Sequence, residues 1–135
     1  MYVGSVHDLM KLPSGESSKN KLLYRYKKRA KKLKLDWTLT DEQCEKLFDS
    51  PCYYCDTVKY SSIKNTGHST PFEYNGIDRV DNSRGYSSDN VVPCCGRCNS
   101  AKNKFTLGEF EDWVIKVYNH RFKDKTDEEE AICLV

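Results

Sequence analysis

Two Cys-x-x-Cys pairs constrain the folding of this 135-residue chain more than any other feature. Cys52 and Cys55 form the first pair, and Cys95 and Cys98 form the second. The spacing within each pair lets both thiolates reach one ion, and two pairs complete the closed tetrahedral site of structural zinc. Free buried thiols or a redox pair are the alternatives, and zinc is the favoured interpretation. The long interval between the pairs, residues 56 to 94, then requires an inserted hairpin.

The other cysteines and the hydropathy of the chain indicate its surroundings. Cys94 is an alternative zinc ligand to Cys95, but the two-residue interval to Cys98 favours Cys95. Cys44 and Cys133 have no evident partners and are expected to act as hydrophobic side chains. Seven cysteines without a recognisable secretion signal argue against a disulfide framework and predict a reducing, cytoplasmic setting. Because no run of about 18 apolar residues is present, no transmembrane helix is expected, and a membrane is not among the expected partners.

Basic residues are concentrated in one segment. Residues 19 to 34 contain nine Lys and Arg and no acid, which leaves 13 basic and 20 acidic residues elsewhere. Such a block favours phosphate backbones or anionic membranes, whereas a solvated helix face is the plainer alternative. Apolar residues in the segment recur at helical spacing, at Leu22, Leu23, Tyr26, Ala30 and Leu33. The predicted nucleic-acid contacts are Arg25, Lys27, Lys28, Arg29, Lys31, Lys32 and Lys102.

Local patterns predict the order of elements along the chain. Thr40 and Thr106 each begin a capping-box pattern, so a helix is expected after both. Strands are expected at residues 74 to 80 and 90 to 94, a short helix at 98 to 104, and a loop at 56 to 76. The predicted regions are a flexible leader (1–18), a basic helical region (19–50), a zinc-stapled core (51–105), a C-terminal helix (106–123) and an acidic tail (124–135).

Two segments carry a resemblance to a known family. Residues 76 to 82, GIDRVDN, and 90 to 102, NVVPCCGRCNSAK, resemble HNH (His-Me finger) endonucleases, particularly zinc-containing phage members similar to recombination endonuclease VII. The resemblance covers residues 52 to 104. It implies an α+β fold, a small zinc-stapled ββα-metal finger of treble-clef-like form with flanking α-helices. It also implies cleavage of DNA phosphodiester bonds with one divalent ion, Mg²⁺ or Mn²⁺.

The resemblance assigns roles to three residues by position. Asp78 matches the family's metal-binding acid, and Asn99 matches its second metal ligand. Asn90 matches the Asn that holds the loop between the two strands. The assignment agrees with the preference of a hard divalent cation for oxygen ligands. A plain turn-forming acid is the structural alternative for Asp78.

Arg79 departs from the family pattern, which has a general-base His at this position. A guanidinium cannot accept a proton near neutral pH, so Arg79 suits the clamping of a phosphate oxygen instead. Asp81, His68 and Tyr86 are then the candidate bases, unless the site is inactive.

Three functions follow, of which a DNA endonuclease with one catalytic divalent ion and a structural zinc is favoured. The first alternative is a non-catalytic, zinc-stabilised nucleic-acid-binding module with a degenerate HNH site. The second is a redox or protein-interaction zinc ribbon, which the basic segment disfavours. The sequence leaves the oligomeric state open.

Overall fold

The computed structural model describes residues 14–67 and 69–123. The chain divides into two compact units, Met1–Ser100 and Ala101–Val135, which are treated separately below. The predicted acidic tail, most of the predicted leader, and both His68 and Cys133 lie outside the described residues. The elements in chain order are α2 (Glu16–Lys32), α3 (Asp41–Asp49), β1 (Ser61–Ile63), β2 (Phe72–Tyr74), β3 (Gly76–Arg79), β4 (Val91–Cys94), α4 (Gly96–Lys102), α5 (Leu107–Tyr118) and the π-helical turn η1 (Asn119–Lys123).

The capping boxes form as predicted. The Thr40 hydroxyl accepts a hydrogen bond from the Gln43 amide, and the Gln43 side chain accepts one from the Thr40 amide, which fixes the start of α3. The same reciprocal pair of hydrogen bonds joins Thr106 and Glu109 at the start of α5. Each box satisfies amides that have no partner within the helix.

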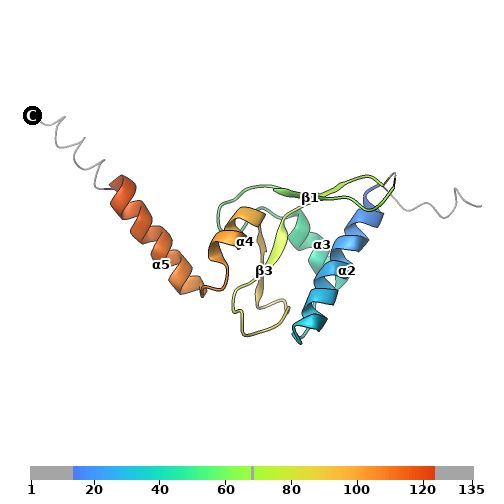
Figure 1. The fold of residues 1–135 in the computed structure, drawn as a ribbon, viewed down its shortest axis with the longest axis horizontal. Helices are drawn as coiled ribbons and strands as arrows, with labels where there is room; N and C mark the ends of the chain where they lie inside the picture. Colours follow the sequence, from blue (N-terminus) through green and yellow to red (C-terminus); the bar gives the residue numbers. More distant parts are fainter. Residues whose placement is uncertain (1–13, 68, 124–135) are drawn as a thin grey trace, which may run out of the picture. The chain divides into compact units, whose positions relative to one another are not determined.

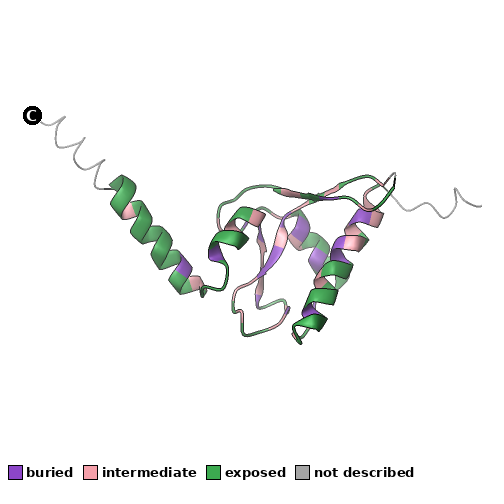
Figure 2. Ribbon diagram, in the orientation of Figure 1, coloured by how far each residue is buried: buried purple, intermediate pink, exposed green. Residues whose placement is uncertain are grey.

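The core of the first unit is aromatic. Phe48 of α3 is fully buried, and its ring centroid lies 5.9 Å from that of Tyr26, 6.1 Å from Phe72 and 6.0 Å from Tyr74. These rings come from α2 and β2, so Phe48 joins three elements that are distant in sequence. Aromatic contacts of this kind add to the free energy gained by burying apolar surface. Figure 2 shows the resulting pattern, in which α2 and α3 are buried on one side and exposed on the other.

The β3–β4 hairpin is antiparallel, and α4 follows it directly (Figure 1). Gly76 pairs with Cys94, and Asp78 pairs with Val92. The Ile77 amide donates a 3.0 Å hydrogen bond to the Tyr26 hydroxyl, which ties β3 to α2, and burial raises the pKa of Tyr26 to about 12. A Cβ atom at Gly76 would lie only 2.6 Å from the same hydroxyl oxygen, so this contact requires glycine. The predicted strands thus form with shorter bounds, and the arrangement is the ββα unit that the sequence predicts.

The segment between the cysteine pairs contains more structure than the predicted loop. Residues 56 to 76 include a second antiparallel hairpin, in which Ser61 pairs with Tyr74 and Ile63 with Phe72. The prediction of a loop is therefore wrong here. The strands are only three residues long, and their stability comes from packing Phe72 and Tyr74 on the core, which local sequence does not reveal.

Asn75 joins the two hairpins. Its side chain is fully buried, donates to the carbonyls of Ser50 (3.0 Å) and Thr57 (2.8 Å), and accepts from the Tyr60 amide (3.0 Å). Its own amide donates to the Phe48 carbonyl. These hydrogen bonds hold the segment that enters the first cysteine pair and the segment that leaves it.

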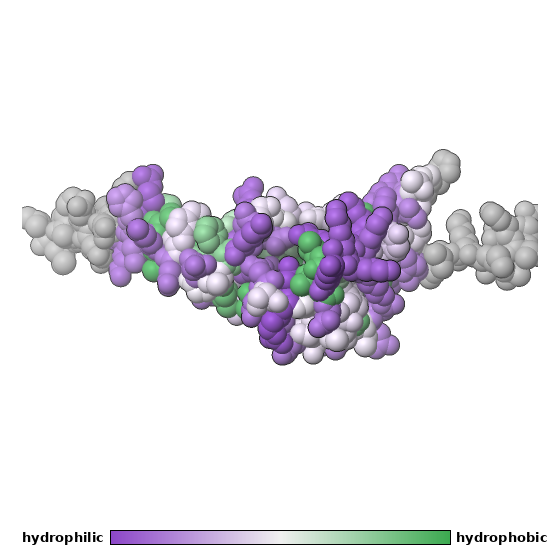
Figure 3. Space-filling view, turned by 60° about the horizontal axis from the view of Figure 1, so that its bottom comes forward, coloured by the Kyte–Doolittle hydropathy of each residue, from purple (hydrophilic) through white to green (hydrophobic). Residues whose placement is uncertain are grey.

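Basic side chains cover the outer surface of α2, and hydrophilic residues, in purple, gather over this part of the molecule in Figure 3. The helix begins at Glu16, three residues before the predicted start, and its acidic first turn complements the positive end of the helix dipole. Among the residues that the structure describes, none of the helices has the length and hydrophobicity needed to cross a bilayer.

Candidate functional site

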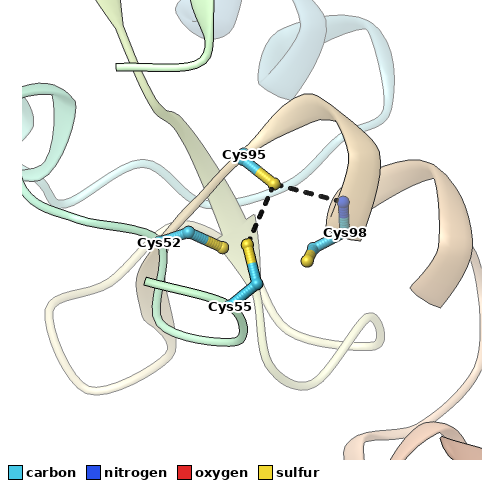
Figure 4. Close-up of side chains that lie close together, drawn as sticks. All are labelled: Cys52, Cys55, Cys95 and Cys98. Atoms are coloured by element: carbon cyan, nitrogen blue, oxygen red, sulfur yellow. Dashed lines mark hydrogen bonds between the residues drawn. The ribbon is translucent and has the colours of Figure 1, made fainter. Parts of the chain in front are cut away.

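The four cysteines of the two pairs converge. The sulfur atoms of Cys52, Cys55, Cys95 and Cys98 all lie within 4.8 Å of one another (Figure 4). The first two come from the turn after α3, and the second two from the end of β4 and the first turn of α4. Cys55 Sγ and Cys95 Sγ are 3.6 Å apart, and the Cys98 amide donates to Cys95 Sγ at 3.4 Å.

Backbone hydrogen bonds hold the first cysteine turn in place. The Cys52 amide donates to the Thr57 carbonyl, and the Asp56 amide donates back to the Cys52 carbonyl, each at 2.9 Å. The Tyr53 amide donates to the Pro93 carbonyl at 2.8 Å, which connects this turn to β4. Because β4 leads directly into Cys95, the hairpin aligns the two pairs.

The sulfur geometry fits one tetrahedral zinc ion. Zinc–sulfur bonds of about 2.3 Å place neighbouring sulfur atoms about 3.8 Å apart, so the cluster closes on an ion with small side-chain shifts. Hydrogen bonds with Thr57, whose hydroxyl oxygen lies 3.1 Å from Cys55 Sγ, lower the pKa of Cys55 to about 6, whereas burial raises the pKa of Cys98. Cys94 is buried beside the cluster but is not among the four converging thiols, so the geometry favours Cys95 over Cys94 as a ligand. Cys44 is fully buried in the core, as expected for a hydrophobic side chain.

Asp78, the predicted metal-binding acid, lies in β3. The residue is only 5% exposed, and its Oδ2 atom accepts a 2.8 Å hydrogen bond from the Tyr54 hydroxyl. Tyr54 lies between the two cysteines of the first pair, so the first cysteine turn also supplies the donor that orients this carboxylate. Burial, followed by the hydrogen bond to the Asp78 carboxylate, raises the pKa of Tyr54. Sequence reasoning missed Tyr54, since no local pattern marks its contact with a residue 24 positions away.

Asn90 organises the loop between β3 and β4. Its side-chain amide donates to the carbonyls of Asp81 (3.1 Å) and Gly85 (2.9 Å), and its side-chain oxygen accepts from the Asp81 amide (2.9 Å). The residue is 1% exposed. A buried amide that satisfies three backbone groups fixes the loop conformation.

Arg79 also bonds to this loop. Its guanidinium donates to the carbonyls of Asn82 (2.7 Å) and Arg84 (2.8 Å) and lies 5.4 Å from the centre of the Tyr86 ring. Hydrogen bonds from a charged donor and a cation–π contact both stabilise this position. In this conformation Arg79 holds the loop, and the phosphate clamp suggested by sequence stays a prediction.

The other predicted site residues have distinct surroundings. Asn99 is exposed on α4, directly after Cys98 of the four-cysteine cluster. Asp81 accepts two hydrogen bonds from Ser83 (2.9 and 2.6 Å), and these lower the pKa of Asp81. Tyr86 is buried, with its ring 4.9 Å from that of Trp37. Asp81 and Tyr86 are therefore both engaged in structural contacts.

The predicted nucleic-acid contacts fall into three environments. Four exposed residues share one stripe of α2 at helical spacing, and none forms an ion pair with another described residue: Arg25, Lys28, Arg29 and Lys32. Lys31 is exposed beside the stripe, whereas Lys27 pairs with Asp41 at 2.7 Å. Lys102 is fully buried, so its ammonium group is not positioned to contact nucleic acid.

Comparisons with known proteins place this geometry in context. No protein-family model matches the chain. Over 103 residues, or 76% of its length, the chain is 41% identical to an uncharacterized protein of Acanthamoeba polyphaga mimivirus. The chain spans only 17% of the length of that relative.

The fold is also similar to that of a solved nuclease. The structure matches the rare-cutting HNH restriction endonuclease PacI, an enzyme described as perturbing DNA, with a TM-score of 0.52 and 23% identity. The match covers 89% of this chain and 87% of PacI. With its ββα hairpin–helix unit and its cluster of four cysteines, the chain has an HNH-type nuclease fold.

Proposed function

We propose that this chain is an endonuclease that hydrolyses DNA phosphodiester bonds with one divalent metal ion and a separate structural zinc. The observation that carries the proposal is the buried Asp78 carboxylate, oriented by Tyr54 from the zinc turn, within an HNH-type fold. An isolated turn-forming acid would need neither burial nor a tyrosine donor.

The side chains of Asp78 and Asn99 offer the oxygen ligands that a hard divalent cation prefers. Asp78 and the amide oxygen of Asn99 would hold Mg²⁺ or Mn²⁺, because such ions prefer oxygen ligands. When bound, the ion would stabilise negative charge on the scissile phosphate and the leaving oxygen. Tyr54 would orient the carboxylate, and Asn90 with Arg79 would hold the adjoining loop. The zinc cluster would fix Cys98 and therefore the start of α4, from which Asn99 projects.

The stripe on α2 supports DNA as the substrate. Its four exposed cations, Arg25, Lys28, Arg29 and Lys32, match the negative charge of a nucleic-acid backbone. Contacts of this kind position a protein on the duplex without reading its sequence.

The position of Arg79 favours a second candidate, a zinc-stabilised nucleic-acid-binding module without catalysis. The residue stands where the family has its general base, and its guanidinium bonds to loop carbonyls. A site that lacks a proton acceptor would bind DNA without cutting it.

A plasmid-nicking assay with Mg²⁺ or Mn²⁺ separates the two candidates. The wild-type chain is expected to nick in the presence of either ion, and Asp78→Ala is expected to abolish nicking. Zinc content and DNA affinity, measured on the same samples, should stay near the wild-type values. DNA binding by the wild-type chain without nicking would favour the second candidate, and nicking by Asp78→Ala at the wild-type rate would refute the assigned site.

A further inference from the structure

The segment between α2 and α3, residues 34 to 39, is hydrogen-bonded to the loop that follows β3. The Tyr86 amide donates to the Asp36 carbonyl at 2.8 Å, and the Thr38 amide donates to the Tyr86 carbonyl at 2.9 Å. Trp37 and Tyr86 form an isolated parallel β-bridge, and their ring centroids lie 4.9 Å apart. This connection, here named the linker clamp, joins the end of the basic helix to the loop beside the candidate site.

Gly85 makes the close approach within the linker clamp possible. A Cβ atom added at Gly85 would collide with the carbonyl oxygen of Asp36 and would lie 2.7 Å from the amide nitrogen of the same residue. Both are backbone atoms, so they cannot turn aside as the end of a flexible side chain can. Any side chain at this position would therefore push the loop away from the linker.

A second attachment joins α2 to the strand of Asp78. Ile77, the residue before Asp78, donates its amide to the Tyr26 hydroxyl of α2 at 3.0 Å. Arg79, the residue after Asp78, bonds to carbonyls of the loop and lies 5.4 Å from the centre of the Tyr86 ring. The rings of Tyr26 and Tyr86 meet edge to face at 6.2 Å, so the two attachments contact each other. Attachment on both sides of Asp78 fixes the orientation of its strand relative to α2 as well as the distance.

We propose that the linker clamp positions the candidate site on DNA, with Gly85 and Tyr86 as its positioning residues. This inference rests on the proposed nuclease function. DNA bound to the α2 stripe would present one phosphate, at a fixed distance along the strand, to the Asp78 carboxylate. Backbone contacts read no sequence, but through the clamp they would determine which linkage is cut relative to the bound segment. Misplacement of a catalytic group by about 1 Å can lower a rate roughly 100-fold, so this connection matters to the reaction.

Separate measurements of DNA affinity and nicking rate test the positioning role. Gly85→Ala should keep the zinc content and the dissociation constant for DNA near the wild-type values, because it alters neither the cysteines nor the α2 stripe. Its single-turnover nicking rate at saturating protein should fall about 100-fold. Gly108→Ala is the matched control, since a Cβ atom at Gly108 would meet nothing within 4 Å, and it should nick at the wild-type rate.

Tyr86 provides a second pair of variants that does not depend on the folding of Gly85→Ala. Tyr86→Leu removes the ring that contacts Trp37 and Arg79, so nicking should slow roughly tenfold while DNA affinity is retained. Tyr86→Phe keeps the ring and should restore the wild-type rate. Equal slowing in the two variants would overturn the inference, as would rates that fall only in proportion to DNA affinity in both Gly85→Ala and Tyr86→Leu.

A neutral phosphate tests the fixed distance directly. In an end-labelled duplex with one methylphosphonate linkage, the wild-type chain should cut least at linkages a fixed number of nucleotides away, where the missing charge falls on the α2 stripe. Gly85→Ala should flatten this minimum. Wild-type cleavage without a minimum, or an unchanged minimum and rate in Gly85→Ala, would overturn the inference and leave the proposed nuclease function standing. A wild-type chain that nicks with neither Mg²⁺ nor Mn²⁺ would overturn the proposed function and this inference with it.

Discussion

Removal of the Tyr54 hydroxyl isolates the contact that links the zinc turn to the candidate hydrolytic site. Tyr54→Phe retains the ring and deletes one donor to Asp78 Oδ2, a 2.8 Å hydrogen bond to a carboxylate that is 5% exposed. A hydrogen bond to a charged group contributes about 1.5–3 kcal/mol, so the free energy of unfolding should fall by about this amount. Partners that orient a metal ligand contribute roughly 10- to 100-fold to metal affinity. The Mg²⁺ concentration that half-saturates nicking should rise accordingly.

Two assays separate the structural effect from the catalytic one. Urea unfolding measures the stability of the variant, and nicking rates across a Mg²⁺ titration measure its metal requirement. Tyr53→Phe is the matched control, because Tyr53 is the adjacent residue of the same turn and is 57% exposed. If Tyr54→Phe matched Tyr53→Phe in both stability and Mg²⁺ dependence, Tyr54 would not orient Asp78, and the reasoning would be refuted.

Three further predictions concern the metal cluster, the basic helix and the loop. Cys95→Ser should lose zinc and unfold the first unit, whereas Cys94→Ala should retain zinc. Metal analysis measures the zinc content, and circular dichroism measures the folding. Equal zinc content in the two variants would contradict the ligand assignment. Arg79→His should lose both hydrogen bonds to loop carbonyls, so the free energy of unfolding should fall by about 1.5–3 kcal/mol and nicking should be slower. Nicking at or above the wild-type rate would instead show that this position needs a base. Replacing the four cations of the α2 stripe, Arg25, Lys28, Arg29 and Lys32, with Glu should weaken binding equally for all DNA sequences. In fluorescence anisotropy, the slope of log affinity against log salt concentration should decrease by roughly 0.9 for each lost phosphate contact. An unchanged slope would mean that another surface binds DNA.

Features governed by local chemistry were predictable from sequence. The cysteine pairs have a fixed ligand spacing, and the capping boxes of Thr40 and Thr106 involve residues three positions apart. The β3–β4 hairpin was predictable because a turn-forming cluster separates two β-prone segments. In each case the determining contacts lie close together in the sequence, or a bound ion would impose them.

Features that depend on tertiary contacts were not predictable. The β1–β2 strands contain too few residues to give an alternating pattern, and Phe72 identifies its strand only through contact with Phe48. In the sequence, nothing distinguishes Tyr54 from any other residue between two cysteines, because its contact with Asp78 exists only in the folded chain. The hydrogen bonds of Arg79 were not predictable either, because they depend on carbonyls that the loop presents only after folding.

The hydrogen bonds of Asn75 separate the β1–β2 hairpin, where insertions are expected to be tolerated, from the part of the chain that carries the metal ligands. They fix the chain where it enters and leaves the β1–β2 hairpin, while the cysteine turn and β3 lie on the other side of this clamp. At the hairpin tip, the space around Gly67 is open, with nothing within 4 Å of the position that a Cβ atom would take, although its φ of 77° favours glycine at that residue itself. Insertions near this tip are therefore expected to leave the metal ligands in place. Relatives with longer tips could acquire new binding preferences while their hydrolytic chemistry stayed the same, and a reporter peptide could be grafted there for the same reason.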